Sequence, residues 1–310
     1  MKFNVSQVAH AMPMTGNRTI FQYMDRLPYV GAGRDLNELV SSVLNAKVAG
    51  KPVILAFGGH VIKQGLGPIV ADLVRRHIVT HLAVTGAVPI HDYELAITGE
   101  TSHDIQADLP KGLYKASSES VSLLNAALVQ DVTLGLGGAI IKVLGDGLTP
   151  VSYSKSGSLS GATVSTRTSA LYAALWHRCP MTVHTAIGAD LVHEYCHDGA
   201  ALGAMLMRDF YRFREVITQM DHGGVFICFG SAVVIPEVFL KAVASSQRDF
   251  NGKPHAFTTA VFDFIKHYRP VENIVNRPTH DNDSQGFHFV GHHEIMLPLL
   301  AAAILEKGSF

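Results

Sequence analysis

The chain has 310 residues, of which 47% are apolar and 16% are charged, and its formal net charge is −1. This composition excludes a disordered chain, and the interspersed charges exclude a basic stripe, so no nucleic-acid partner is expected. The longest apolar run, Ile295–Leu305, is too short to span a bilayer, so no membrane partner is expected either.

The first thirty residues carry charges and no long apolar stretch, which predicts that no signal peptide is present. The three cysteines, Cys179, Cys196 and Cys228, are far apart in the sequence. This spacing is typical of reduced thiols and favours a cytoplasmic protein, and Cys196 has no evident activating partner.

Short apolar runs alternate along the chain with amphipathic helical patterns, which is typical of a parallel sheet covered on both faces. We therefore expect an α/β fold, with one domain over residues 1–310 in which residues 1–34 form an N-terminal extension. In chain order, the main elements predicted are a helix at 35–49, strands at 52–57 and 80–85, helices at 117–129 and 169–177, a strand at 181–185, a helix at 200–220, and strands at 225–229 and 256–261. The stretch Gly135–Gly161 is expected to be a glycine-rich helix followed by a long loop that faces the active site.

Glycine and polar residues follow four of the predicted strands. In an open parallel sheet the ligand binds beyond the carboxyl ends of the strands, and glycine turns let the backbone approach it. Ordinary strand-to-helix turns are the alternative for each cluster taken alone, and no G-x-G-x-x-G fingerprint follows a strand. Four such turns at one edge predict a shared ligand site. Its members are Gly58, Gly59, His60 and Lys63; Gly86, His91, Asp92 and Glu94; Gly188, Asp190, His193 and Glu194; and Gly230 and Ser231.

Residues 193–197 read HEYCH, which matches the H-E-x-x-H zinc motif. That motif requires a continuous helix, so that His193 and His197 share one face and Glu194 acts as a base on metal-bound water. Asp198 and Gly199 follow immediately and favour the end of a helical turn. The match is therefore interpreted as accidental, and no metal site is predicted from it.

The stretch GGHVIKQGLG, followed by VTGAVPIHDYELAITGETSHDI, resembles the deoxyhypusine synthase superfamily, specifically its bacterial deoxyhypusine synthase-like branch. SALYAALWHRCPMTVHTAIGADL, GGVFICFGSAVVIPEVFLKA and HHEIMLPLLAAAI continue the resemblance in order over residues 35–305. The resemblance implies a Rossmann-like sheet that binds NAD, in a homotetramer with sites at dimer interfaces. It also implies oxidation of spermidine by NAD and transfer of the aminobutyl group to an amine.

By position, the resemblance assigns two groups of residues. Those expected to face the dinucleotide or substrate are Gly59, His60, Thr85, Gly86, Asp92, Asp190, Gly230 and Ser231. Those expected to bind an amine substrate are Glu94, His193 and Glu194.

One departure from the family concerns its catalytic lysine, which holds the aminobutyl group as an imine. Gln285 and Gly286 stand nearest that position, and no lysine lies between Lys266 and Lys307. Lys63, Lys142 and Lys155 are the lysines near predicted strand ends, and none has an evident activating environment. We therefore expect NAD-dependent chemistry on a small amine, polyamine-like or amino-acid-like substrate without a lysine imine.

Several residues keep two interpretations. His91 and Asp92 could form an acid–base pair or could cap a helix. His292 and Glu294 could belong to the site or could cap the last helix. Lys63 could contact a phosphate or could be a solvated surface residue. Three function classes remain open: an NAD-dependent enzyme, a metal-dependent hydrolase or lyase that uses the 17 histidines, and a non-catalytic ligand-binding relative.

Overall fold

A computed structural model describes residues 24, 27–101, 108–112, 117–147, 166–252, 254–280 and 283–308. Most of the predicted loop after the glycine-rich helix, with Lys155, lies outside these residues. Within them, six parallel strands form one sheet in the order β3-β2-β1-β4-β5-β6. The strands are β1 (Val53–Phe57), β2 (His81–Thr85), β3 (Met181–His184), β4 (Val225–Phe229), β5 (Thr258–Asp263) and β6 (Gln285–Val290).

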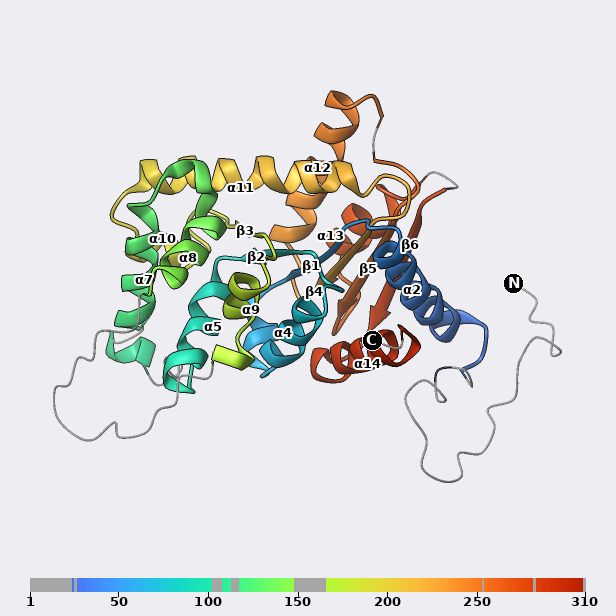
Figure 1. The fold of residues 1–310 in the computed structure, drawn as a ribbon, viewed down its shortest axis with the longest axis horizontal. Helices are drawn as coiled ribbons and strands as arrows, with labels where there is room; N and C mark the ends of the chain where they lie inside the picture. The colour runs from blue at the N-terminus through green and yellow to red at the C-terminus, as the bar shows by residue number, and fades with distance from the viewer. Residues whose placement is uncertain are drawn as a thin grey trace, which may run out of the picture.

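Side chains of successive strand residues point to opposite sides of the sheet, and in the central strands both sides are buried. In β1, Val53, Leu55 and Phe57 belong to one apolar cluster, whereas Ile54 and Ala56 belong to the other. All five are buried, as expected for a parallel strand between two helical layers. The predicted α/β fold, a parallel sheet with helices on both faces, is confirmed (Figure 1).

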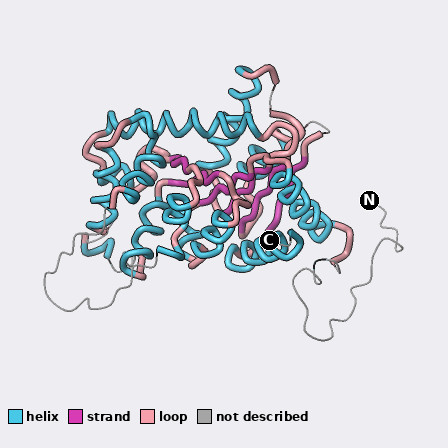
Figure 2. The backbone as a smooth tube through the Cα atoms, in the orientation of Figure 1, coloured by secondary structure: helices cyan, strands magenta, loops and turns pink. Residues whose placement is uncertain are grey.

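The helices form a layer on each face of the sheet, which Figure 2 shows as strands enclosed by helices. The layer over Ile54 and Ala56 consists of α11 (Gly199–Gln219), α12 (Val234–Asp249) and the π-helical turn η5 (Val271–Asn276), entered through α13 (Tyr268–Pro270). The opposite layer consists of α2 (Gly31–Val48), α4 (Gly67–Arg75), α5 (Ala87–Thr98), α9 (Ala170–Trp176) and α14 (His293–Gly308). Helices α7 (Ser118–Leu128) and α8 (Gly135–Gly145) extend this layer to β3. The short helical segments that the structure describes between these elements are α3 (Gly59–Lys63), η2 (Leu109–Lys111), η3 (Val132–Leu134), η4 (Thr166–Thr168) and α10 (Val192–Tyr195).

The predicted glycine-rich helix is confirmed as α8, which packs against the edge strand β3. A Cβ at Gly137 would overlap the carbonyl of Met181, so only glycine permits this approach. The carboxylate of Asp209, on α11, accepts hydrogen bonds from the amides of Gly137 (2.9 Å) and Val183 (3.0 Å). One buried side chain therefore ties α8, β3 and α11 together.

The described helices include no single membrane-spanning candidate. None of them taken singly is long and apolar enough to cross a bilayer, although the bent pair formed by Ser118–Leu128 and Val132–Gly145 passes by length and composition.

Candidate functional site at the carboxyl edge of the sheet

The strand order reverses between β1 and β4, which are neighbours in the middle of the sheet. The chain leaves β1 toward the layer of α4 and leaves β4 toward the layer of α12. In open parallel sheets, this divergence creates the crevice in which ligands bind, beyond the carboxyl ends of the strands. The predicted site residues after β1 and β4 lie at this switch point.

An aromatic cluster lies beside the switch point and is formed by His60, Phe264, His292 and His293. The ring of His293 stacks on Phe264, with centroids 4.4 Å apart, and His60 meets Phe264 edge-on at 5.0 Å. His60 and His293 are 5.5 Å apart, and His292 lies 5.5 Å from Phe264. The structure thus brings His60 together with the first residues of α14, which sequence reasoning had assigned separately.

His293 is the most unusual member of the aromatic cluster. Its side chain is fully buried, and neither Nδ1 nor Nε2 makes a well-aligned hydrogen bond, although the backbone of Phe262 is near enough to raise the pKa of the ring. Burial lowers the pKa of His293, and the charge of Asp263 opposes the shift. In its neutral form the ring donates a hydrogen bond from one nitrogen and accepts one at the other. Thr185 Oγ1, in the turn after β3, is also buried without a partner, whereas the predicted Thr85 is half-buried at the end of β2. Unpaired buried polar groups are rare, and a bound ligand is one explanation for them.

The glycines at the switch point are required by packing between the turns. A Cβ at Gly58 would lie 2.7 Å from the carbonyl oxygen of Gly230, and one at Gly230 would overlap the ring of His293. Gly230 also has φ +60°, which favours glycine. At Gly59 the added atom would lie 2.9 Å from the Cβ of Ala87. These glycines therefore serve first to bring the loops together, and a ligand is not needed to explain them.

His91 and Glu94 form a buried pair one turn apart on α5. His91 Nδ1 lies 3.1 Å from Glu94 Oε2, and the side chains are 7% and 1% exposed. Ser120 Oγ lies 3.5 Å from Glu94 Oε1, and the amide of Ser117 lies 3.4 Å from it. A Cβ at Gly59 would lie 3.3 Å from His91 Cδ2, so the ring lies directly behind the turn after β1. This pairing of an imidazole with a carboxylate is the arrangement of an oriented acid–base group.

Asp92 is placed differently from its neighbour His91. Its carboxylate accepts hydrogen bonds from the amides of Ala170 (3.1 Å) and Leu171 (2.9 Å) and from the hydroxyl of Ser169. These groups form the N-terminus of α9, which attracts a negative charge. Burial raises the pKa of Asp92, and the hydrogen bonds oppose that shift. Asp92 therefore caps the distant helix α9, whereas the capping interpretation from the sequence concerned the helix that begins beside it, α5, in whose interior Asp92 lies.

Asp190, His193 and Glu194 line a pocket of about 450 Å³ after β3. Asp190 Oδ2 accepts a hydrogen bond from the amide of Ala186 (3.1 Å), and burial raises the pKa of Asp190. His193 Nε2 is buried without a partner. A Cβ at Gly86 would lie 2.9 Å from Asp190 Oδ1, which brings the turn after β2 against this pocket.

The zinc-peptidase interpretation of HEYCH lacks its helix, as predicted from the sequence. Helix α10 ends at Tyr195, and Cys196 has extended backbone angles (φ −81°, ψ 119°). His197 therefore does not continue the helix that carries His193. In the part of the chain that the structure describes, the three-residue group with metal-ligand spacing lies elsewhere, at the amino edge of the sheet.

The remaining predicted residues lie at the rim of the site. Ser231 Oγ accepts a hydrogen bond from the amide of Ile235 (3.2 Å) in the first turn of α12. Lys63 is exposed at the end of α3. His292 Nδ1 lies 3.6 Å from Glu294 Oε1, and both side chains are exposed. The exposed Gly188 has φ +82° in the turn before α10.

Sequence reasoning missed Phe264 as a site residue because the predicted strand at 256–261 ended too early. Strand β5 runs to Asp263, so Asp263 and Phe264 stand at the carboxyl edge. The run TTAVFDF carries the signal that would have found them, since its apolar residues continue past Val261 to the first acidic residue.

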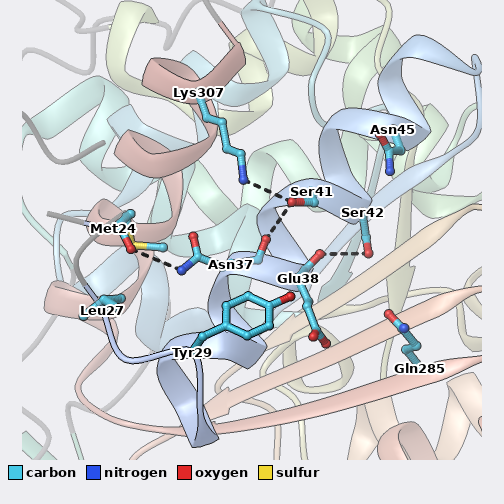
Figure 3. A pocket seen from close by; sticks show the side chains of 10 residues that line it. All are labelled: Met24, Leu27, Tyr29, Asn37, Glu38, Ser41, Ser42, Asn45, Gln285 and Lys307. Atoms are coloured by element: carbon cyan, nitrogen blue, oxygen red, sulfur yellow. Dashed lines mark hydrogen bonds between the residues drawn. The ribbon is translucent and has the colours of Figure 1, made fainter. Parts of the chain in front are cut away.

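A second hollow, of about 580 Å³, lies away from the carboxyl edge and is shown in Figure 3. It is lined by residues of α2, by Lys307 near the end of α14, and by Gln285 at the start of β6. Its polar groups bond largely to one another: Lys307 donates to Ser41 Oγ (3.1 Å), and Asn37 donates to the carbonyl of Met24 (3.2 Å). We assign it no part in the site.

The sequence matches no protein-family model and no curated protein sequence. Solved structures do resemble the fold. The complex of AgrE with ornithine and NAD⁺ has a TM-score of 0.55 and 14% identity, over 89% of this chain and 33% of the AgrE chain. This chain thus spans about a third of the AgrE chain that it matches.

Two further matches cover more of the partner chain. A proposed LOR/SDH protein from Methanococcus maripaludis S2 has a TM-score of 0.52 and 15% identity, over 89% of this chain and 69% of that one. A proposed deoxyhypusine synthase from Entamoeba histolytica has a TM-score of 0.50 and 12% identity, over 89% and 90%. At these identities the matches establish a shared fold alone.

Proposed function

We propose that this protein is an NAD-dependent enzyme that acts on a small amine or amino-acid-like substrate at the carboxyl edge of its sheet. The observation that carries the proposal is the buried, unpaired imidazole of His293 in the aromatic cluster at the β1–β4 switch point. The fold shared with AgrE, whose complex holds ornithine and NAD⁺, supports the same choice of ligands. The proposal includes the expected single domain, homotetramer and cytoplasmic location.

The residues at the switch point fit a dinucleotide. Phe264 and His60 offer ring faces and edges for an aromatic ring system, and the nitrogens of His293 offer buried polar groups. Bound NAD would supply a hydride acceptor.

The pocket after β3 suits a cationic amine. Burial raises the pKa of Asp190 because it removes water from around the carboxylate. An ammonium group bound beside it would stabilise the ionised carboxylate. Glu194 is exposed at the same pocket and adds a second negative charge. The unpaired His193 Nε2 can bond a polar group of the substrate. Glu94 orients His91, which would take a proton from the amine during oxidation.

Binding of NAD by the wild-type protein and two phenylalanine variants, measured by titration calorimetry, tests the proposal. Phe264→Ala removes a ring of the aromatic cluster, and Phe250→Ala removes a similarly exposed ring at the end of α12. Loss of a stacking contact worth about 1.5 kcal/mol would raise Kd about tenfold for Phe264→Ala. Phe250→Ala should bind NAD like the wild type.

Turnover is then followed as NADH absorbance with ornithine, putrescine and spermidine. Binding of NAD without turnover of any amine would favour the non-catalytic relative. A wild-type protein that does not bind NAD would end the proposal.

A further inference from the structure

Asp221, His222 and His255 come together at the amino edge of the sheet, opposite the proposed NAD site. Asp221 and His222 follow α11 just before β4, and His255 precedes β5. One ligand atom from each residue lies within 4.8 Å of the other two. His255 is separated in the sequence from Asp221 and His222 by the whole of β4 and α12, so the fold brings it to them.

We propose that these three side chains bind a divalent transition-metal ion of the Zn²⁺ type. His255 Nδ1 lies 3.5 Å from Asp221 Oδ1, and His222 Nε2 lies 3.8 Å from Asp221 Oδ2. Tetrahedral Zn²⁺ with bonds of about 2.0–2.2 Å holds its ligand atoms roughly 3.4 Å apart. The two distances to the Asp221 carboxylate are thus close to this value, and the ligand atoms of His222 and His255 lie within 4.8 Å of each other.

The site is held in shape by its backbone before any ion binds. Asp221 Oδ1 accepts a hydrogen bond from the amide of His255 (3.0 Å), and the amide of His222 donates to the carbonyl of His255 (3.0 Å). The amide of Gly223 donates to the carbonyl of Ala256 (2.8 Å). Lys51 Nζ donates to the backbone carbonyl of Asp221 (2.7 Å), which anchors this turn to the segment before β1. The two loops are thus already joined.

The donor set selects the class of metal. Two imidazole nitrogens and one carboxylate oxygen suit Zn²⁺, Ni²⁺ or Cu²⁺, whereas Ca²⁺ and Mg²⁺ prefer oxygen ligands. The Asp221 side chain is 9% exposed, but those of His222 and His255 are 64% and 44% exposed. Solvent can therefore reach the ion and supply a fourth ligand. The ion would act as a clip between the turn before β4 and the turn before β5.

The test is a titration of the purified, metal-free protein with Zn²⁺ at neutral pH. The expected result is one equivalent bound and a rise of several degrees in the unfolding temperature at about a hundredfold excess over Kd, because the ion binds the folded state. His222→Ala and His255→Ala should each weaken binding at least tenfold. The side chains of His222 and His255 are 64% and 44% exposed, so their removal is not expected to prevent folding.

A matched control comes from a second pair of neighbouring histidines. The rings of His77 and His177 are 5.8 Å apart, and His77 shares the left-handed backbone (φ 52°) of His222 (φ 59°). The double variant His77→Ala/His177→Ala should bind Zn²⁺ like the wild type. Unchanged Zn²⁺ binding in His222→Ala and His255→Ala, or no saturable binding by the wild type, would overturn the assignment. The outcome is independent of NAD binding at the opposite edge.

Discussion

The ring of His293 stacks on the ring of Phe264, with 4.4 Å between their centroids. This contact joins the first residue of α14 to the turn after β5, beside the turn that follows β4. Gly230 completes the arrangement, because the space that a Cβ would need there is filled by the His293 ring. The conformation of the switch point therefore depends on residues from three separate segments.

Gly230→Ala is expected to destabilise the protein by about 2–4 kcal/mol. Part of the loss comes from the left-handed backbone at φ +60°, and the larger part from overlap with a fully buried ring. Chemical denaturation measures the change in the free energy of unfolding. Gly65→Ala is the control, since Gly65 has φ +76° but open space around its Cβ position, and should cost only about 1 kcal/mol.

A double-mutant cycle separates the two causes further. Adding His293→Ala to Gly230→Ala removes the overlap, so the two losses should be clearly less than additive. Additive losses would mean that backbone conformation alone explains the effect of Gly230→Ala.

His91→Gln is expected to lower turnover by about 10²–10⁴-fold while leaving the Kd for NAD nearly unchanged. The reason is that His91 pairs with Glu94 in a buried acid–base arrangement behind the Gly59 turn. Steady-state kinetics and NAD titration measure the two quantities. Equal turnover of His91→Gln and the wild type would remove His91 from the chemistry.

The neighbouring variant Asp92→Asn serves as the control for His91→Gln. An amide cannot accept every hydrogen bond that the carboxylate accepts from Ser169, Ala170 and Leu171. The expected result is a loss of about 1–3 kcal/mol in stability with little change in turnover per folded molecule. A large specific loss of turnover would instead restore the acid–base interpretation of Asp92.

The strands could be read from the sequence where burial is complete. Strands β1 and β4 are continuous apolar runs, and both were predicted within a residue. Strand β6 was not predicted, because it lies at the sheet edge and alternates buried Phe287 and Phe289 with exposed or half-buried residues. A two-residue error at the end of β5 was enough to hide Phe264.

The partners of the site residues were not predictable in the same way. Asp92 and the N-terminus of α9 are far apart in the chain, so no local pattern marks Asp92 as a cap. The glycines at strand ends were correctly placed in turns. The reason that glycine is required there is close packing against residues such as His293, which only the tertiary structure reveals. Local spacing predicts elements, whereas the pairing of side chains depends on the order of the strands.

Asp209 predicts a pH dependence of stability. Burial raises the pKa of Asp209 from 3.8 to about 7, although the amides of Val183 and Gly137 oppose the shift. Between these two values the folded state binds one proton more than the unfolded state. The contribution of Asp209 is therefore fully present below about pH 4 and is lost as pH rises through about 7.

Denaturation at pH 5 and pH 8 measures this effect in the wild type and in Asp209→Asn. The wild type should lose roughly 2.5–3 kcal/mol relative to Asp209→Asn over this interval, at about 1.4 kcal/mol for each of the two pH units between pH 5 and the folded pKa of about 7. Asp249→Asn, which alters a surface carboxylate paired with Arg214, is the control and should follow the wild type. Parallel pH profiles for Asp209→Asn and the wild type would contradict the raised pKa.

The last prediction concerns the absence of a lysine imine. An imine-forming lysine needs a depressed pKa, from burial or from neighbouring cations, and access to the substrate. Lys63 is exposed at the end of α3, and Lys142 pairs with Asp146 on α8. Lys266, in the turn after β5, stands at the carboxyl edge but is exposed as well. None of these three side chains lies in a buried, water-excluded position.

Borohydride added with NAD and spermidine is therefore expected to trap no covalent adduct. Intact-mass spectrometry should give the unmodified chain, while a parallel sample without borohydride, if it turns over an amine, accumulates NADH and a released carbonyl or imine product. Repeating the reaction with Lys266→Arg provides the control, because arginine keeps the charge at the carboxyl edge but cannot form an imine. A reduced aminobutyl group on Lys266 or any other lysine, lost in the matching variant, would restore an aminobutyl-transfer mechanism for this chain.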